Sequence, residues 1–345
     1  MLNPGKRPYV AVVSVLLVTG LIVGMVGCSP DRDPTPAPHD DFEIRTWHDL
    51  NAIRDNMGGN HLLMNDLDLA TAGYLELAST TANGGKGWQP IGTPNDPFYG
   101  TFDGQGYEIR DMVIYQPGPD QNWVGLFGVI AQGAVVENVG VVNAAITGYM
   151  VVGGLAGASE GSISNSYFSG DLTGTARAGG LAGFISEHGT VSQCYATGSL
   201  TGQCCIGGLV GGNNGTVEDC YSTASVTGDM RVGGLVGDNY STVNSSYSTG
   251  NVTGNENAGG LVGLNEGTVV NSFWDVLTSG IEASDGGSGK TTAEMLDMAT
   301  FTNTASDGLD EPWEMVAVGP DERNAAYSWN IVNGVAYPFL GWQSA

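Results

Sequence analysis

Between residues 153 and 275, the apolar and polar positions follow one pattern that returns five times. Each copy opens with two glycines, an apolar pair and a third glycine. These openings begin at Gly153, Gly179, Gly207, Gly233 and Gly259. The starts are therefore 26, 28, 26 and 26 residues apart. A fixed period of this size is typical of a solenoid, because one unit is too small to bury its own apolar face and must stack on the next.

Within each copy, short β-prone runs alternate with Gly, Asn, Asp or Ser, and no run has the length or the 3.6-residue period of a helix. A Ser or Cys precedes an aromatic residue at one register of every copy. These aromatic residues are Tyr167, Tyr195, Tyr221, Tyr247 and Phe273. The two extra residues of the second copy fall in the turn at 184–188. We therefore interpret each copy as one coil of three β-strands, with insertions confined to turns.

The glycine-rich core, followed by Asn, Gly, a β-branched residue and Ser/Cys-Tyr, resembles the GLUG motif of bacterial surface proteins. The resemblance covers residues 153–275, and residues 124–128 are similar to a degenerate first copy. Known carriers include adhesin-like proteins and the non-catalytic part of some immunoglobulin A peptidases. The resemblance implies an all-β fold, a right-handed parallel β-helix, and it implies no reaction.

Residues 1–27 have the pattern of an export signal, because Lys6 and Arg7 precede an apolar run that ends in small residues. The tripeptide before Cys28 resembles a lipobox, which implies a lipoprotein with lipid on the Cys28 sulfur. An uncleaved membrane anchor is the alternative. Both interpretations predict a chain held on a membrane and facing outward from the cell envelope. If the host has two membranes, Ser29 in place of Asp after the cysteine resembles the outer-membrane sorting pattern.

The remaining parts of the chain differ from one another in composition. Residues 28–41 are rich in Pro and Asp, which predicts an extended tether. Residues 42–123 are interpreted as an amino-terminal cap with the first coils, including a short helix capped by Thr46. Residues 124–275 hold the GLUG-type repeats. Residues 276–345 contain three of the seven tryptophans and are interpreted as an apolar cap over the last coil.

The chain is strongly acidic, because it has 36 Asp and Glu residues against 11 Lys and Arg residues. Its formal net charge is −25. Such a surface repels nucleic acid and other polyanions, so neither is expected as a partner. A nucleotide is not expected either. The segment 284–291 resembles a phosphate-binding loop but lacks its first glycine, and the run before it is too polar for a buried strand.

The cysteines and histidines predict no metal site and no cofactor, because the sequence has neither a C-x-x-C pair nor a histidine cluster. Cys194 and Cys220 share one register in adjacent coils, and Cys204 and Cys205 are neighbours in the turn between them. Export would permit disulfides, but inert thiols are equally compatible with this pattern.

The residues present bear on several possible enzymatic functions. A metallopeptidase would need His-Glu-x-x-His, which is absent. A carbohydrate-active β-helix enzyme, either a polysaccharide lyase or a hydrolase, is the main enzymatic alternative. Its candidate acids lie mostly in turns and share no register, and its candidate basic groups are few. The acids are Asp171, Glu218, Asp219, Asp229 and Asp238, and the basic groups are Arg177, His188 and Arg231.

Tyr167, Tyr195, Tyr221 and Tyr247 form a ladder that would bind sugar rings if it faced outward. We favour an internal stack whose hydroxyls reach water. We expect a non-enzymatic, lipid-anchored surface protein that displays a β-helix for adhesion or for contact with a glycan or another protein. A carbohydrate-active enzyme and a passive structural spacer are the alternatives.

Overall fold

The computed structural model describes residues 41–305 and 308–343, and these belong to one compact unit. Its strands form a parallel β-solenoid of about six turns, which confirms the all-β parallel β-helix predicted from the repeats. The predicted signal peptide, Cys28 and all of the tether except Asp41 lie outside the described residues. Within the described part, no helix is long and apolar enough to cross a membrane.

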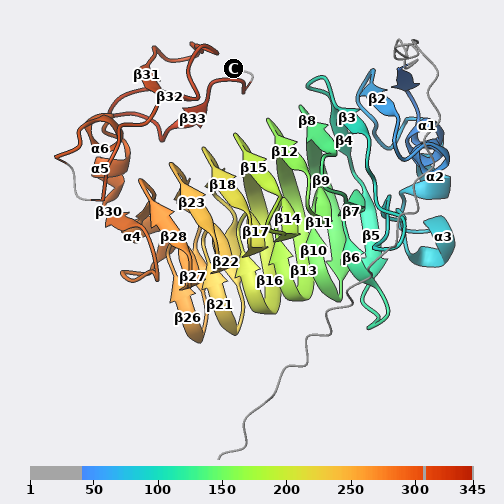
Figure 1. Cartoon of the computed structure of the whole chain (residues 1–345), viewed down its shortest axis with the longest axis horizontal. Coiled ribbons are helices and arrows are strands. Elements are labelled where there is room, and N and C mark those ends of the chain that lie inside the picture. The colour runs from blue at the N-terminus through green and yellow to red at the C-terminus, as the bar shows by residue number, and fades with distance from the viewer. Residues whose placement is uncertain (1–40, 306–307, 344–345) are drawn as a thin grey trace, which may run out of the picture. The chain divides into compact units, whose positions relative to one another are not determined.

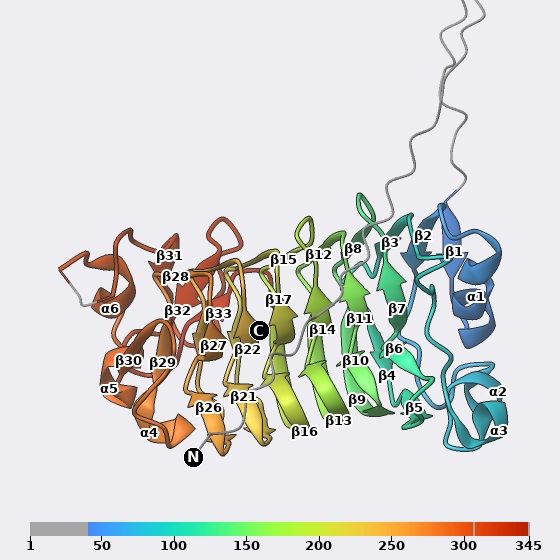
Figure 2. The same ribbon diagram turned by 60° about the horizontal axis from the view of Figure 1, so that its bottom comes forward.

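Three sheets form the sides of the β-helix, and its coils stand in a row (Figure 1). The nine-stranded sheet consists of β1 (Phe42–Ile44), β2 (Asn60–Leu63), β3 (Thr101–Asp103), β8 (Val135–Glu137), β12 (Ser162–Ser164), β15 (Thr190–Ser192), β18 (Thr216–Glu218), β23 (Thr242–Asn244) and β28 (Thr268–Val270). The six-stranded sheet, seen in Figure 2, consists of β7 (Phe127–Ile130), β11 (Ala156–Ser159), β14 (Ala182–Ile185), β17 (Val210–Asn213), β22 (Val236–Asn239) and β27 (Val262–Asn265).

The third side is a fifteen-stranded sheet that carries the aromatic register of the repeat. Its strands are β4 (Glu108–Arg110), β5 (Val113–Gln116), β6 (Asn122–Val124), β9 (Gly140–Gly148), β10 (Met150–Gly153), β13 (Tyr167–Gly179), β16 (Tyr195–Gly207), β19 (Tyr221–Ser222), β20 (Ser225–Thr227), β21 (Met230–Gly233), β24 (Tyr247–Ser248), β25 (Val252–Thr253), β26 (Glu256–Gly259), β29 (Phe273–Asp275) and β30 (Ser288–Lys290).

Neighbouring coils pair in the register that the repeat predicts, so equivalent side chains stand one above another. The leucine of each glycine-rich opening lies in the interior, fully buried, as Leu155, Leu181, Leu209, Leu235 and Leu261. The amide of each leucine donates to the carbonyl of the next, as in Leu209 to Leu235 at 2.9 Å. Burying one such side chain stabilises the fold by about 1.5–3 kcal/mol. The leucine column therefore holds adjacent coils together.

The amino-terminal cap covers the first coil with short helices. Its helices are α1 (Trp47–Ala52), the 3-10 helix η1 (Ile53–Asp55), α2 (Tyr74–Leu77) and α3 (Ala82–Gly85). Thr46 is the predicted N-cap of α1, because its hydroxyl accepts from the Asp49 amide at 3.1 Å and the Asp49 carboxylate accepts from the Thr46 amide in return. Trp47 and Trp88 are fully buried beneath these helices.

The carboxyl-terminal region lies mainly along the flank of the coils, so its predicted role as a plug over the last coil is corrected. The end of the stack is formed by β30, which pairs with β29, and by α4 (Val276–Ser279). The chain then turns back alongside the coils (Figure 1, red) through α5 (Thr292–Met295), α6 (Ala299–Thr302) and the three-stranded sheet of β31 (Met315–Ala317), β32 (Trp329–Ile331) and β33 (Phe339–Leu340).

The aromatic ladder faces outward from the coil, so the internal stack favoured from the sequence is wrong. Alternation along each strand places the residue after the aromatic one in the interior, as with Phe168 after Tyr167 and Ala196 after Tyr195. Tyr221 and Tyr247 belong instead to a second apolar cluster with Trp313 and Trp329 of the carboxyl-terminal region, and Tyr195 packs against this cluster. The interior beside the ladder is narrow, because a Cβ on Gly208 would lie 2.2 Å from the Ser222 hydroxyl.

Candidate binding hollow at the end of the tyrosine ladder

The rings of the tyrosine ladder cover one another's faces. Successive ring planes differ by 7°, 3° and 5°, and their centroids are 4.7, 5.0 and 5.1 Å apart from Tyr167 through Tyr195 and Tyr221 to Tyr247. Tyr195 and Tyr221, which have a stacked neighbour on both faces, therefore offer groups outside the ladder only their edges and hydroxyls. A sugar ring stacks on an exposed aromatic face, so it cannot stack within this ladder.

The carboxyl-terminal region also covers most of the ladder. Tyr221 and Tyr247 are only 8% and 1% exposed, so these two predicted ligand-surface residues are buried under Trp329 and its neighbours. The Tyr221 hydroxyl accepts from the Gln343 amide at 2.8 Å, and the Tyr247 hydroxyl donates to the Pro338 carbonyl. Burial raises the pKa of both phenols. These tyrosines serve as the platform on which the carboxyl-terminal region packs.

The ladder ends at Tyr167, because its position in the preceding coil is occupied by Gly140. A Cβ on Gly140 would lie 2.4 Å from Cζ of Tyr167, so only glycine leaves room for the ring. The Tyr167 hydroxyl donates to the Glu108 carboxylate, which also pairs with Arg110. Burial, followed by this hydrogen bond, raises the pKa of Tyr167. The phenol is therefore fixed in position as a neutral donor.

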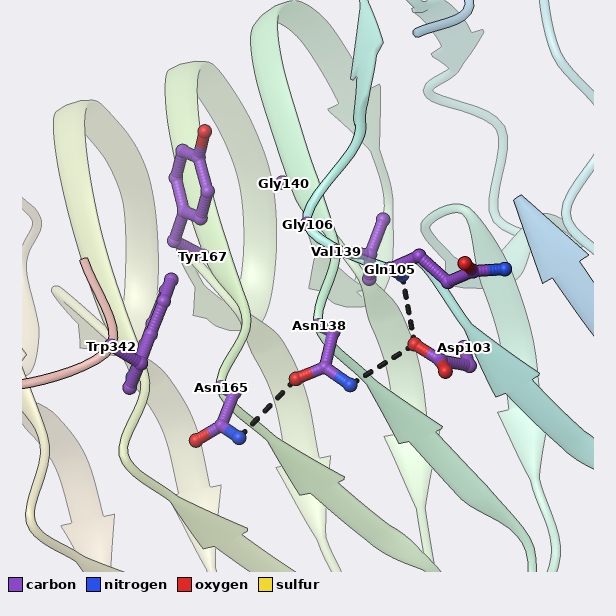
Figure 3. Close-up of a pocket in the computed structure, with 9 residues that line it drawn as sticks. All are labelled: Asp103, Gln105, Gly106, Asn138, Val139, Gly140, Asn165, Tyr167 and Trp342. Atoms are coloured by element: carbon purple, nitrogen blue, oxygen red, sulfur yellow. Dashed lines mark hydrogen bonds between the residues drawn. The ribbon is translucent and has the colours of Figure 1, made fainter. Parts of the chain in front are cut away.

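A hollow of about 360 Å³ opens beside this last ring (Figure 3). Its lining is Asp103, Gln105, Gly106, Asn138, Val139, Gly140, Asn165, Tyr167 and Trp342. The Trp342 ring lies 6.2 Å from that of Tyr167, and its Nε1 donates to the Gln193 carbonyl at 2.9 Å. The hollow therefore has two aromatic rings on one side, one from the coil and one from the carboxyl-terminal region.

A row of polar side chains runs along the floor of the hollow (Figure 3). Nδ2 of Asn165 donates to Oδ1 of Asn138 at 3.3 Å, and Nδ2 of Asn138 donates to Oδ1 of Asp103 at 3.0 Å. The backbone N–H of Gln105 donates to the same Asp103 oxygen at 2.8 Å. Oδ2 of Asp103 has no donor among the described residues, so the row can still accept hydrogen bonds from a ligand. Aromatic faces beside fixed amides suit the alternating apolar and hydroxyl surfaces of a sugar.

The hollow was not predicted from the sequence. Asn138 and Asn165 share a corner register with left-handed φ of 54° and 47°, a conformation that Asn tolerates better than most residues. The available signal was the degenerate first copy, where Gly140 replaces the ladder aromatic. Trp342 and Asp103 had no such signal, because they lie outside the repeats and reach the hollow through the fold.

The candidate catalytic acids named from the sequence do not converge in this hollow. Asp238 is buried beside Arg231, with Nη1 of Arg231 3.5 Å from its Oδ2, and burial raises its pKa. Asp219 accepts from Nε1 of Trp329 at 3.0 Å, and Asp229 accepts from Nδ2 of Asn255 at 3.2 Å. These carboxylates hold the structure together at separate places.

Glu218 lines a different hollow, of about 370 Å³, together with Asp310 and Glu311. All three carboxylates belong to exposed residues. Asp310 and Glu311 are brought there because their amides donate to Oδ1 of Asn271 at 2.8 and 3.1 Å. Sequence reasoning named only Glu218, because the other two acids reach the coils through the fold of the carboxyl-terminal region.

The four cysteines of the β-helix are free thiols in the structure. Cys194 and Cys220 are fully buried in one interior column, and Sγ of Cys204 lies 2.8 Å from Sγ of Cys205. Burial raises the pKa of the Cys205 and Cys220 thiols, which keeps them protonated. Among the described residues, no group of three or more His, Cys, Asp or Glu side chains could hold a metal ion.

Comparison with known proteins identifies the repeat. The GLUG motif matches residues 148–173 and 202–227. Over 152 residues, 42% of the chain, the sequence is 35% identical to Halomucin of Haloquadratum walsbyi. Over 162 residues, 46% of the chain, it is 31% identical to a candidate Gly-rich membrane protein of Evansella cellulosilytica. The matched segments cover only 2% and 18% of these two relatives.

A solved structure, a candidate immunoglobulin A1 protease from Bacteroides ovatus, has a similar fold. Its TM-score is 0.61 at 20% identity, and the match covers 89% of this chain and 94% of that one. At this identity the likeness shows the fold alone. The motif matches and the stacked coils together show that the chain is a GLUG-motif repeat protein folded as a parallel β-helix.

Proposed function

We propose that this protein is a non-catalytic surface lipoprotein that binds a glycan in the hollow between Tyr167 and Trp342. The export signal and the lipobox-like sequence before Cys28 support display on the outside of a membrane. The name of the Evansella relative, a candidate Gly-rich membrane protein, supports the same location. The coils and the carboxyl-terminal region then hold the hollow in a fixed shape.

The observation that carries the glycan assignment is the pairing of aromatic rings with a row of fixed amides. The Trp342 and Tyr167 rings can cover the apolar C–H face of a pyranose, while Asn138, Asn165 and Asp103 accept from or donate to its hydroxyls. A volume of about 360 Å³ is within the range of small-ligand sites, roughly 300–1,000 Å³. The hollow has one lining carboxylate, whereas glycoside hydrolysis uses a pair at fixed separation.

The negative charge around the hollow favours a neutral sugar as the ligand. Asp103 lines the hollow, Glu108 lies behind Tyr167, and the whole chain carries a net charge of −25. An anionic sugar would be repelled by this field, because few cations are present to offset it. The neutral hydroxyls of a hexose or an N-acetylhexosamine avoid that repulsion.

The test is affinity gel electrophoresis of the full chain through cellulose, chitin and mannan derivatives that are soluble and uncharged. We expect at least one polymer to retard the wild type, and Trp342→Ala and Asn165→Ala to lower the affinity about tenfold or more. Tyr327→Ala is the matched control, because Tyr327 is 39% exposed and lies outside the hollow. Equal retardation of Trp342→Ala and wild type, with unchanged circular dichroism, would contradict the assignment.

A carbohydrate hydrolase is the second candidate, and the hollow lined by Glu218, Asp310 and Glu311 favours it. Two of these carboxylates could act as acid and base on a bound polysaccharide. Release of new reducing ends by the wild type, abolished in Glu218→Gln and in Glu311→Gln, would establish this activity and replace the non-catalytic proposal. Absence of release from every polymer that the protein binds would support the proposal.

A further inference from the structure

A second group of hollows surrounds Trp123 at a different corner of the coil. Trp123 is in β6, beside the six-stranded sheet, and it is 37% exposed. Hollows of about 280 and 360 Å³ both include its side chain in their lining. A third, of about 510 Å³, shares Gln116, Asp120 and Gln121 with the first. Shared lining residues therefore place the three hollows next to one another, and Trp123 lines two of them.

The stacking of the coils positions this indole. Trp123 has a left-handed φ of 61°, and the residues at the same register of the following coils have left-handed φ as well. A side chain on Gly157 would lie 2.6 Å from the Trp123 Cα, so the next coil packs directly on this backbone. The backbone conformation is therefore a property of the corner, and a bulky aromatic residue there is unusual.

The two hollows beside Trp123 offer different chemistry. One is largely apolar, with Pro94, Val129, Ala158 and Phe184 in its lining. The other is lined by amides, including Gln89, Gln116 and Asn122. Oδ1 of Asn122 is buried and receives no hydrogen bond from the described residues. A buried acceptor without a donor is rare in folded proteins, and a bound water or a shift of the Asn122 side chain toward the hollow would supply the missing partner.

Charge again selects a neutral ligand. The ionisable groups lining these two hollows are Asp120 and Glu160, and no Lys or Arg of the described chain lines either one. Lys86 lines only the third hollow, and the Arg54 guanidinium beside Gln89 and Pro90 already donates to their carbonyls. A phosphate, a sulfated sugar or a uronic acid would therefore find no cation in the lining of these two hollows. A purely apolar ligand would leave the amides of the second hollow without partners. A sugar chain satisfies both hollows, because each pyranose has an apolar face and a rim of hydroxyls.

We propose that Trp123 forms a second binding subsite for a neutral oligosaccharide, with the indole stacked on one sugar ring and the amides of Gln116 and Asn122 bonded to its neighbours. This inference rests on the proposed glycan-binding function. It adds a separate site at a corner of the coil that the carboxyl-terminal region does not cover. Two such sites on one chain would raise the affinity for a long polymer above that for a short oligosaccharide.

Fluorine NMR of the full chain, labelled with 5-fluorotryptophan, can separate the two sites. The chain has seven tryptophans, and the Trp123→Phe and Trp342→Phe variants assign the two resonances of interest. Chitohexaose, cellohexaose and mannohexaose are the probes, and a hexamer of galacturonic acid is the anionic comparison. We expect one neutral hexamer to shift the Trp123 resonance, and Trp342→Ala to leave this shift unchanged. Trp123→Ala lacks the reporting resonance, so its binding is measured by isothermal titration calorimetry, where we expect the affinity of that hexamer for the Trp123 subsite to fall at least tenfold.

The outcomes distinguish this inference from the proposed function. A shift of the Trp342 resonance alone would overturn the second subsite and leave the first. A shift of the Trp123 resonance alone would support the second subsite and contradict the first. No shift with any neutral hexamer would overturn both. Equal binding of the galacturonic acid hexamer would refute the neutral ligand class. The resonances of the other six tryptophans report the fold of Trp123→Ala, so unchanged positions of these resonances exclude misfolding as the cause of a loss in this variant.

Discussion

Replacing Trp329 by alanine tests whether the tyrosine ladder holds the carboxyl-terminal region in place. Trp329 is fully buried, its ring lies 4.8 Å from that of Trp313 and 5.7 Å from that of Tyr247, and its Nε1 donates to Asp219 at 3.0 Å. Truncation removes these ring contacts and leaves the half-buried Asp219 carboxylate without its indole donor. It should therefore act on the interface between the ladder and the carboxyl-terminal region.

The expected loss follows from the two kinds of contact. Truncating a buried tryptophan to alanine costs about 3–5 kcal/mol in well-packed interiors. An unpaired buried polar group adds roughly 1–3 kcal/mol, although Asp219 can partly rehydrate once the indole is gone. We expect a destabilisation of about 4–6 kcal/mol, which is the truncation cost plus part of the cost of the unpaired carboxylate. It should be confined to residues 292–343, because the coils have their own buried core.

Hydrogen exchange measured by mass spectrometry is the suitable assay, since repeat proteins often unfold in parts and a single unfolding free energy would mix them. Amides in β31 to β33 should lose most of their protection, whereas β14 and β17 in the central coils should keep theirs. Trp342 forms one wall of the hollow, so affinity for a retarding polymer should also fall. Tyr327→Ala is the control.

Two results would refute this reasoning. A destabilisation below about 1 kcal/mol would mean that the ladder is not the main support of the carboxyl-terminal region. Loss of protection throughout the coils would mean that the β-helix depends on this region for its own stability. In that case the ladder could not be regarded as a platform added to a self-sufficient solenoid.

Three further predictions concern single sites. Burial raises the pKa of Asp219 above its unfolded value, so the charge of this carboxylate opposes folding at neutral pH. Asp219→Asn should therefore raise the melting temperature at pH 7. This gain should vanish as the pH falls below the unfolded pKa of Asp, about 3.9, because the wild-type carboxyl is then neutral in both states. Cys194 and Cys220 are fully buried, so in a variant with Cys28, Cys204 and Cys205 replaced by serine, Ellman's reagent at pH 8 should label no thiol before denaturation, and rapid labelling of this native variant would contradict the packing. Cys28→Ala should move the exported chain from the membrane fraction to the soluble fraction, and an unchanged distribution would argue against a lipid at Cys28.

The repeated part of the fold could be predicted from the sequence because every coil has to bury the same apolar positions. The leucine of each opening must be buried, and the 26-residue spacing places Leu155, Leu181 and their equivalents in one column. The two extra residues of the second copy fall at a turn, since β14 ends at Ile185 and β15 begins at Thr190, as expected for an insertion in a solenoid.

The direction of the ladder could not be predicted, because the residues after the aromatic ones have no common character. They are Phe168, Ala196, Ser222, Ser248 and Trp274. Either member of each pair could have faced inward. The carboxyl-terminal region decides which residue of each pair faces inward, because it covers the tyrosines and so allows them to lie outside the coil without being fully exposed. The hollow at Trp342 depends on the same long-range contact, so no local pattern could indicate it.

The carboxyl-terminal region makes contacts with successive coils, through Gln193, Tyr221, Tyr247 and Asn271. This arrangement limits how the gene can change by internal duplication. A coil inserted between Tyr195 and Tyr247 would lengthen the stack by about 4.8 Å and move each tryptophan away from its partner. Coils can be gained or lost without that mismatch only on the amino-terminal side of the coils that contact the carboxyl-terminal region. Variation in the number of coils among closely related chains should therefore be concentrated before Tyr167.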